Sequence, residues 1–290
     1  MFKINVSKLM ALLLVIIFCV SLSSGVEAKK SKIYYKLYKI EADYKANIGV
    51  YAIDTDSGKI INYNPSKRFA YCSTHKVFTA AEILRRYSPE QLQEVIHYAE
   101  DDILSYAPVT KEHVDTGMTL FEICEAAVRF SDNTAANLMI NKLGGIENFK
   151  LALQDIGDEI TNPVRIEPEM NEFVPESTID TSTPKQMALN LQKYVLGDVL
   201  NEEQKQILIN WMSNNAITDS LIKAGVPDGY KVIDKSGSGT YGTRNDIAII
   251  YPENGKPIVM AIMTNRNDKF DRYDDKLIAG IANILMTNLW

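Results

Sequence analysis

Ser73-Thr74-His75-Lys76-Val77-Phe78 begins the stretch that decides the fold, because the pattern of apolar residues changes there from that of strands to that of helices. Apolar side chains recur at helical spacing from this point, which predicts a helix over residues 74–86. Before it, two segments alternate in polarity like strands and are joined by a turn-rich segment over residues 54–58. These two segments are Asn47–Ile53 and Lys59–Tyr63.

Helical patterns continue to about Trp211, and strand patterns return near the C-terminus. The predicted helices are Ser31–Tyr44, 74–86, 119–130, 133–143, 147–156, 184–195, 201–212 and the amphipathic Asp271–Trp290. The returning strands are Lys231–Lys235, Asp246–Tyr251 and Ile258–Thr264. Strands at both ends around a helical middle predict a mixed α/β fold of the α+β kind. We expect an antiparallel sheet flanked by helices, an all-helical lobe, and an active site in the cleft between them.

The first 28 residues are predicted to be a signal peptide. Lys3 and Lys8 give the chain a positively charged start. The apolar run Leu9–Val20 follows them and is too short to span a membrane. A small-residue cleavage pattern follows at Val26-Glu27-Ala28. The protein is therefore expected to be exported, to a periplasm or into the medium. An uncleaved N-terminal anchor is the alternative.

Composition limits the number of domains and the class of partner. The chain has 290 residues, of which 46% are hydrophobic and 23% charged, so it can bury one or two cores. Its formal net charge of −6 argues against a nucleic-acid partner. We expect one functional domain over residues 29–290, with a sheet lobe at about 29–66 and 213–290 and a helical lobe at about 67–212.

Neither the cysteines nor the histidines form a metal-binding pattern. Export permits disulfides, but Cys19 lies in the predicted signal peptide, which leaves Cys72 and Cys124. A bridge between these two stays open, although lone cysteines are more often free and packed. The histidines lack metal-ligand spacing and are interpreted as surface or helix-packing residues: His75, His97 and His113.

Ser73 and Lys76 form the first candidate catalytic pair. Residues three apart share one face of a helix, so Nζ of Lys76 can lie near Oγ of Ser73. A serine hydroxyl becomes a nucleophile when a nearby base removes its proton. The helix N-terminus at Ser73 would also favour developing negative charge. S-x-x-K is common by chance, so this pair alone does not identify an enzyme.

Two further motifs offer polar groups at element ends. Ser131-Asp132-Asn133 lies between two predicted helices and offers a hydroxyl for proton transfer and an amide for substrate, or alternatively only an N-cap. Lys235-Ser236-Gly237 ends a strand-like run and offers a fixed cation, or alternatively only a strand end. The formal dinucleotide fingerprint Gly237-x-Gly239-x-x-Gly242 is rejected, because a strand-like run follows it instead of a helix.

A long loop carries the last candidate base. It begins near Arg165, spans about sixteen residues and ends near Asp180. Glu167 could act as a general base on a water molecule that Asn171 also holds. Arg165 and Asp180 could pair across the loop ends. The alternative is a solvated, charged loop.

In this order and context, the motifs resemble those of the class A serine β-lactamases. The resemblance covers nearly the whole chain after the signal peptide and includes 106–110, 131–138, 143–145, 180–184, 221–227 and 244–246. It implies hydrolysis of the β-lactam amide bond of penicillins, and of some cephalosporins, through an acyl-enzyme on Ser73, and hence antibiotic resistance. The alternative is a D-alanyl-D-alanine peptidase or penicillin-binding protein, which normally lacks the loop that carries Glu167.

The resemblance also implies a role for individual residues. The implied catalytic residues are Ser73 as nucleophile, Lys76 and Ser131 as proton carriers, and Glu167 as the base that activates the deacylating water. The implied substrate-binding residues are Tyr106, Asn133, Asn171, Lys235, Ser236, Gly237, Ser238 and Arg244. Backbone N–H groups of Ser73 and Ser238 would hold the oxyanion. Lys76 and Glu167 both stay open as the base for acylation.

The chain departs from the resembled family at two cysteine positions. Ala80 stands where many members carry the partner of the cysteine equivalent to Cys124. Gly239 stands where some carbapenem-hydrolysing members carry the partner of a cysteine at the Cys72 position, so a carbapenemase loses support. We expect a monomer that binds a small-molecule β-lactam. No nucleic acid, no stable membrane partner after signal cleavage, no cofactor and no metal are expected.

Overall fold

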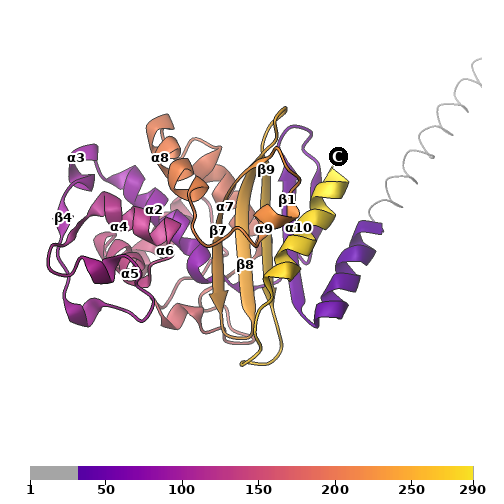
Figure 1. The fold of residues 1–290 in the computed structure, drawn as a ribbon, viewed down its shortest axis with the longest axis horizontal. Helices are drawn as coiled ribbons and strands as arrows, with labels where there is room; N and C mark the ends of the chain where they lie inside the picture. The colour runs from indigo at the N-terminus through magenta and orange to yellow at the C-terminus, as the bar shows by residue number, and fades with distance from the viewer. Residues whose placement is uncertain (1–31, 290) are drawn as a thin grey trace, which may run out of the picture.

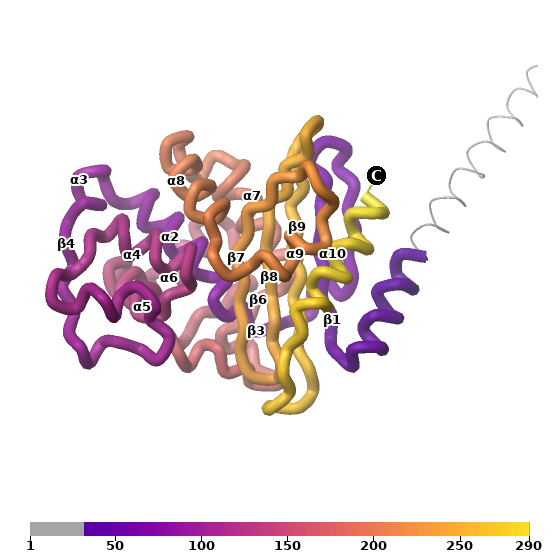
Figure 2. The backbone as a smooth tube through the Cα atoms, in the orientation of Figure 1, coloured from indigo at the N-terminus to yellow at the C-terminus, as the bar shows by residue number. Residues whose placement is uncertain are grey.

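The computed structural model describes residues 32–289, so the predicted signal peptide lies outside the described residues. An antiparallel sheet of five strands forms its centre, in the order β2-β1-β9-β8-β7 (Figure 1). These strands are β1 Asn47–Asp54, β2 Ile60–Tyr63, β7 Lys231–Gly239, β8 Thr243–Tyr251 and β9 Ile258–Asn265. The two ends of the chain therefore meet in one sheet and the helical middle projects from it, as predicted (Figure 2).

The helices confirm the predicted pattern. A helix over residues 32–44 precedes the sheet. The longer helices of the middle and the C-terminus are α2 His75–Arg86, α4 Leu120–Arg129, α5 Asn133–Lys142, α6 Ile146–Asp155, α7 Pro184–Val195, α8 Glu202–Ser213 and α10 Asp275–Leu289. Side-chain caps set several of their starts: Thr119 and Glu122 form a capping box before α4, as Asn201 and Gln204 do before α8.

Each face of the sheet buries its own core, because alternate side chains of a strand point to opposite faces. On one face, Ile48 and Met260 pack with the helix over residues 32–44 and with α9 (Ile222–Gly225) and α10. On the other face, Ile247 and Val259 pack with α2, α4, α7 and α8. The second core is continuous with the helical part, which fixes the helices against the sheet.

Helix α2 passes through the middle of the helical part. Every residue from His75 to Leu84 is buried, polar ones included. Buried polar groups must find partners inside the protein. Glu82 does so by accepting hydrogen bonds from Arg85, Arg86 and Tyr194. The first turn of the same helix buries His75 and Lys76 beside the cleft described below.

The structure differs from the prediction at element ends and in short elements. Strand β7 continues to Gly239, so the K-S-G motif lies inside a strand and not at its end, and Ser236 pairs with Asp246 of β8. The C-terminal helix begins at Asp275 and not at Asp271. The unpredicted elements are too short to show periodicity: α3 Pro89–Leu92, α9 Ile222–Gly225, β3 Phe69–Ala70, β4 Val95–Ile96, β5 Met118–Thr119, β6 Thr181–Ser182 and the 3₁₀ turns Cys72–Thr74, Glu100–Asp102, Thr110–Glu112 and Glu169–Asn171.

Within residues 32–289, none of the helices combines the length and the apolar character that crossing a lipid bilayer requires.

Candidate active site

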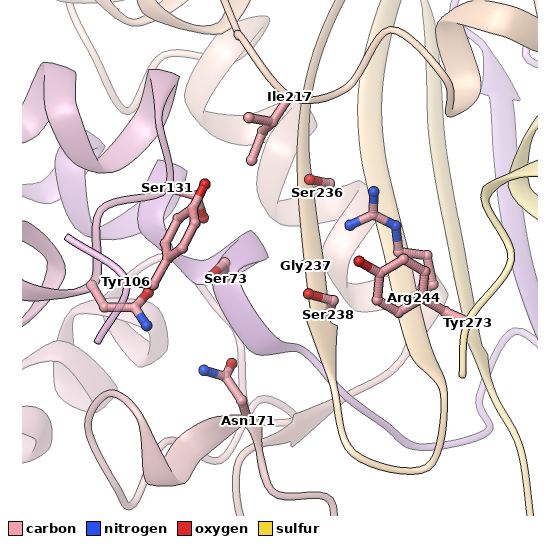
Figure 3. Close-up of a pocket in the computed structure, with 11 residues that line it drawn as sticks. Ser73, Tyr106, Ser131, Asn171, Ile217, Ser236, Gly237, Ser238, Arg244 and Tyr273 are labelled. Carbon is pink, nitrogen blue, oxygen red and sulfur yellow. The ribbon is translucent and has the colours of Figure 1, made fainter. Parts of the chain in front are cut away.

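A cavity of about 370 Å³ lies where the open edge of β7 faces the helical part (Figure 3). Ser73, Ser131 and Tyr106 lie on its helical side, and Ser236, Ser238 and Arg244 on its sheet side. The remaining lining residues are Asn133, Asn171, Ile217, Gly237 and Tyr273. Of the predicted site residues, only Lys76, Glu167 and Lys235 are absent from this lining, and all three are buried directly behind it.

Ser73 sits in a tight turn that leads into α2. Cys72 before it has a φ of 48°, a left-handed conformation that is uncommon outside glycine. The side chain of Asn245 on β8 supports this turn by donating to the carbonyls of Ala70 and Tyr71, at 2.7 and 3.3 Å. Ser73 is therefore presented to the cavity by a strained turn that the sheet holds in place.

Gly237 lets β7 approach the serine turn. A Cβ atom at this position would lie 2.9 Å from the carbonyl oxygen of Tyr71 and 3.1 Å from the backbone nitrogen of Ser73. Such contacts with backbone atoms are closer than a side chain tolerates. The absence of a side chain therefore sets the width of the cavity between β7 and Ser73.

Lys76 is the centre of the buried polar network. Its ammonium group donates to Oδ1 of Asn133 at 2.6 Å and to the carbonyl of Ser131 at 2.8 Å, and it lies 3.0 Å from Oε1 of Glu167. These three contacts use all three N–H bonds. Burial lowers the pKa of Lys76, and the neighbouring carboxylate of Glu167 opposes that shift.

The hydroxyl of Ser73 takes a different partner from the expected one. Lys76 was the predicted neighbour, but the only hydrogen bond of this hydroxyl within residues 32–289 goes to Oε1 of Glu167, at 3.3 Å. Oε1 of Glu167 therefore faces both the serine hydroxyl and the lysine ammonium. Proton transfer between these groups needs no rearrangement of the backbone.

Hydrogen bonds hold both the backbone and the side chain of Glu167. The side chain of Asn137 on α5 donates to the backbone carbonyl of Glu167 at 2.8 Å and accepts from its N–H at 3.0 Å. The amide of Asn171 donates to Oε2. Burial is the largest effect and opposes ionisation of this carboxyl, but the charge of Lys76 together with the other polar neighbours outweighs it and holds the pKa of Glu167 below its usual range. Glu167 is therefore a carboxylate in the resting site, able to accept a proton.

The loop over residues 165–180 is closed as predicted. Arg165 pairs with Asp180 through Nε and Oδ2 at 2.5 Å, and Asp180 also accepts from the N–H groups of Val164 and Arg165. At its middle the loop meets β7 and β8, because the N–H of Thr240 donates to the carbonyl of Asn171 at 3.0 Å. These ties fix Glu167 and Asn171 relative to the strand edge.

Ser131 bridges the two lysines of the site. Nζ of Lys235 donates to Oγ of Ser131 at 3.0 Å, and Lys76 lies 3.4 Å from the same oxygen. Ser131 has a φ of 58°, again left-handed, which turns its hydroxyl into the cavity between two helices. Burial, with the like charge of Lys76, lowers the pKa of Lys235 to about 7. The chain Lys76–Ser131–Lys235 can thus pass a proton along one wall.

Asp132 positions the wall that carries Tyr106. Its carboxylate caps α5 by accepting from the N–H of Ala135 and also accepts from the N–H groups of Val109 and Thr110. The carbonyl of Tyr106 accepts from the N–H of Asn133 at 2.9 Å. Asp132 of the S-D-N motif is therefore the N-cap of α5, while its neighbours Ser131 and Asn133 line the cavity.

Arg244 provides positive charge at the sheet side of the cavity. Its Nε donates to Oδ1 of Asp275 at 2.8 Å, and its guanidinium stacks 4.7 Å above the ring of Tyr273. Asp275 is the first residue of α10, where a carboxylate is favoured by the helix dipole. With one nitrogen paired, the outward nitrogens can bind an anionic group beside Ser236 and Lys235.

The structure adds residues that sequence reasoning did not select. Asn137, Asn245 and Asp275 hold site residues through contacts between distant parts of the chain, for which the sequence carries no local signal. His75 was interpreted as a surface or packing residue, but its Nε2 lies 3.8 Å from Oε1 of Glu167. The position of His75 between Ser73 and Lys76 was the one sequence feature that could have indicated a place in the site.

The two cysteines of the described chain are both free and buried. Cys72 adjoins Ser73 but does not line the cavity. Burial raises the pKa of its thiol, which disfavours the nucleophilic thiolate.

Comparisons with known proteins agree on one family. Residues 32–289 match the beta-lactamase enzyme family. The chain is 48% identical over 254 residues to a β-lactamase of Bacillus subtilis (strain 168), which covers 88% of this chain and 83% of that protein. It is 48% identical over 251 residues to β-lactamase 3 of Bacillus cereus, which covers 87% of this chain and 79% of that protein.

Solved structures agree as well. The class A β-lactamase from Clostridium kluyveri DSM 555 has a TM-score of 0.88 at 50% identity, over 89% of this chain and 98% of that one. The β-lactamase from Streptomyces albus G has a TM-score of 0.86 at 34% identity, over 88% of this chain and 98% of that one.

Proposed function

The chain belongs to the β-lactamase enzyme family as a class A serine β-lactamase, and on that premise we propose that it hydrolyses penicillins through an acyl-enzyme on Ser73. β-Lactam hydrolysis and the resulting antibiotic resistance are the activity of the family. The proposal adds the substrate preference and the roles of the residues. The observation that carries it is the position of Glu167, whose Oε1 faces both Ser73 and Lys76.

Acylation begins when Oγ of Ser73 attacks the β-lactam carbonyl carbon. The hydroxyl proton has two routes: directly to Oε1 of Glu167, or to Lys76 after its ammonium group has first given a proton to Oε1 of Glu167 or to Oγ of Ser131. Ser131 delivers a proton to the lactam nitrogen as the C–N bond breaks. Backbone N–H groups of Ser73 and Ser238 stabilise the oxyanion.

In deacylation, Glu167 is the only general base. Glu167 removes a proton from a water molecule that Asn171 helps to hold, and the water oxygen attacks the acyl carbon. Ser73 then leaves and regains its proton. A penicillin-binding protein is acylated by the same serine chemistry but lacks a base at this place, so the geometry around Glu167 favours the hydrolase over the alternative peptidase.

Substrate binding uses the sheet side of the cavity. Lys235, Ser236 and Arg244 bind the carboxylate of the substrate, and Arg244 supplies the charge at the outer end. Asn133 and the backbone of Ser238 bind the side-chain amide, with Asn171 and Gly237 in the adjoining lining and Tyr106 as the opposite wall. We also propose that residues 1–28 direct export, that residues 29–290 form the catalytic domain, and that the mature enzyme acts as a monomer.

The experiment is steady-state hydrolysis of a penicillin, a cephalosporin and a carbapenem by the purified mature protein, together with Glu167→Ala. Wild type should hydrolyse the penicillin fastest. Glu167→Ala should be acylated but should accumulate the adduct on Ser73, as read by intact-protein mass spectrometry. Ser73→Ala is the matched control and should form no adduct. Turnover of penicillin by Glu167→Ala at the wild-type rate would show that another group activates the water.

A further inference from the structure

His75 is a buried titratable residue that the mechanism above leaves unused. Its side chain is 2% exposed, and its Nε2 lies 3.8 Å from Oε1 of Glu167. That distance is too long for a hydrogen bond. Within residues 32–289, Nε2 has no hydrogen-bond partner at all. A polar atom buried without a partner is costly, so its placement against the catalytic carboxylate calls for an explanation.

The contacts of Thr79 determine which ring nitrogen of His75 carries the hydrogen. Oγ1 of Thr79 donates its one hydrogen to the carbonyl of His75 at 3.1 Å. With that hydrogen committed to the carbonyl, we assign Nδ1 as the donor in its 3.1 Å contact with the same oxygen. Nε2 of the neutral ring then has a lone pair and no hydrogen. Burial favours this neutral form, because it lowers the pKa of His75 even though Glu167 opposes the shift.

The ring of His75 packs between two aromatic side chains. Tyr71 and Phe149 flank it in edge-on contacts, with ring centroids 5.9 and 6.0 Å from that of His75. Nε2 lies beside the carboxylate of Glu167, 3.8 Å from Oε1. While Glu167 is a carboxylate, two acceptors face each other and no bond forms.

Protonation of Glu167 changes this relationship. Oε2 already accepts from the amide of Asn171, and one lone pair of Oε1 accepts from Lys76. In the acyl-enzyme the oxygen of Ser73 is an ester oxygen and no longer donates to Oε1. The remaining lone pair of Oε1 is therefore free to take a proton, and Nε2 of His75 is the neutral acceptor beside it.

We propose that His75 is a positioning residue for deacylation, whose Nε2 accepts a hydrogen bond from Oε1 of protonated Glu167. The inference rests on the proposed role of Glu167 as the base. In the step, one O–H bond of water breaks, the water oxygen bonds to the acyl carbon, and the proton moves to Oε1. When the bond between the acyl carbon and Oγ of Ser73 breaks, the same proton returns to Oγ. His75 thus stabilises a form of Glu167 that exists only between these two events.

The test separates the acylation and deacylation rate constants by stopped-flow kinetics with a penicillin. His75→Phe keeps a ring between Tyr71 and Phe149 but removes the acceptor. We expect its deacylation rate constant to fall at least about tenfold, while the acylation rate constant changes less than about threefold. His75→Gln places an amide oxygen near the position of Nε2 and should restore deacylation to within about threefold of wild type.

A packing role for His75 gives a different result. Equal losses in both rate constants, no loss in either, or a Gln variant as slow as the Phe variant would each overturn the proposal. If His75→Phe does not fold, Thr79→Val gives the same test, because it removes the partner that fixes the tautomer. That variant should slow deacylation and spare acylation, and equal effects on both would again overturn the proposal.

Glu167→Ala is measured alongside and tests the underlying function separately. If it fails to accumulate acyl-enzyme, the proposed role of Glu167 is wrong. If it does accumulate acyl-enzyme but His75→Phe deacylates normally, the role of Glu167 stands and only the role of His75 is wrong.

Discussion

Nζ of Lys235 donates a 3.0 Å hydrogen bond to Oγ of Ser131, although the two residues are 104 positions apart in the chain. One comes from the strand at the sheet edge and the other from the turn before α5. The bond joins Lys235, which we propose binds the substrate carboxylate, to Ser131, which we propose donates the leaving-group proton. The two lobes of the site are therefore coupled through a lysine whose charge depends on pH.

The charge of Lys235 should set the alkaline side of the pH profile. Its pKa is lowered to about 7, so the ammonium form is lost as pH rises through that value. We expect kcat/KM for a penicillin to fall between about pH 7 and about pH 9, mainly through KM. Lys235→Arg keeps its charge throughout this range and should flatten the decline. If kcat/KM of Lys235→Arg fell with the same midpoint pH as that of wild type, the titrating group would be one other than Lys235.

The same shift has a consequence for stability. An unfolded chain titrates Lys235 near 10.5, so between about pH 7 and pH 10.5 the unfolded state binds more protons than the folded state. This residue therefore makes the free energy of unfolding rise with pH in that window. Chemical denaturation of wild type and Lys235→Met at several pH values checks the sign, since the variant should lack this contribution.

Arg244→Ser should weaken substrate binding more than catalysis. The variant loses a charge-assisted hydrogen bond of about 1.5 to 3 kcal/mol, so KM for a penicillin should rise at least about tenfold. Arg272→Ser removes the same charge from an exposed position before α10 and serves as the control. If both variants raise KM equally, general electrostatic attraction explains the effect and the specific contact does not.

Asp180→Asn should release the loop that carries Glu167. The change removes the ion pair with Arg165 and weakens two hydrogen bonds from backbone N–H groups. We expect a loss of about 2 kcal/mol in the free energy of unfolding and a fall in the deacylation rate. Urea unfolding and stopped-flow kinetics measure the two effects. Glu176→Gln, an exposed change within the same loop, should alter neither.

Gly239→Ala should displace Asn171. The added Cβ would lie 2.2 Å from the carbonyl oxygen of Asn171, so the loop or the strand must move. A displacement of about 1 Å at the deacylating water can cost on the order of 100-fold in rate. Gly280→Ala on α10 meets only the end of the Ile40 side chain, at 3.0 Å, and should keep full activity. If Gly239→Ala deacylated at the wild-type rate, the contact between the added Cβ and the carbonyl of Asn171 would have relaxed without moving the side-chain amide of Asn171.

Much of the fold follows from local pattern. The predicted helices of the middle of the chain match the observed ones to within one residue at each end. Three of their starts are fixed by N-cap side chains that the sequence displays, those of Thr119, Thr183 and Asn201. The strand β7 was predicted too short. Its last residues, Ser236 to Gly239, have no alternation of their own, and pairing with β8 is what makes them a strand.

The sequence alone determined which reactive groups the protein has, their order, and the architecture that brings them to one cleft, because motif spacing and apolar periodicity are local properties. Only the tertiary structure decided which groups touch. It placed Ser73 and His75 against Glu167, and Arg244 against Asp275. It also decided their ionisation, because a pKa depends on burial and on charges within a few ångströms, and those neighbours come from distant parts of the chain.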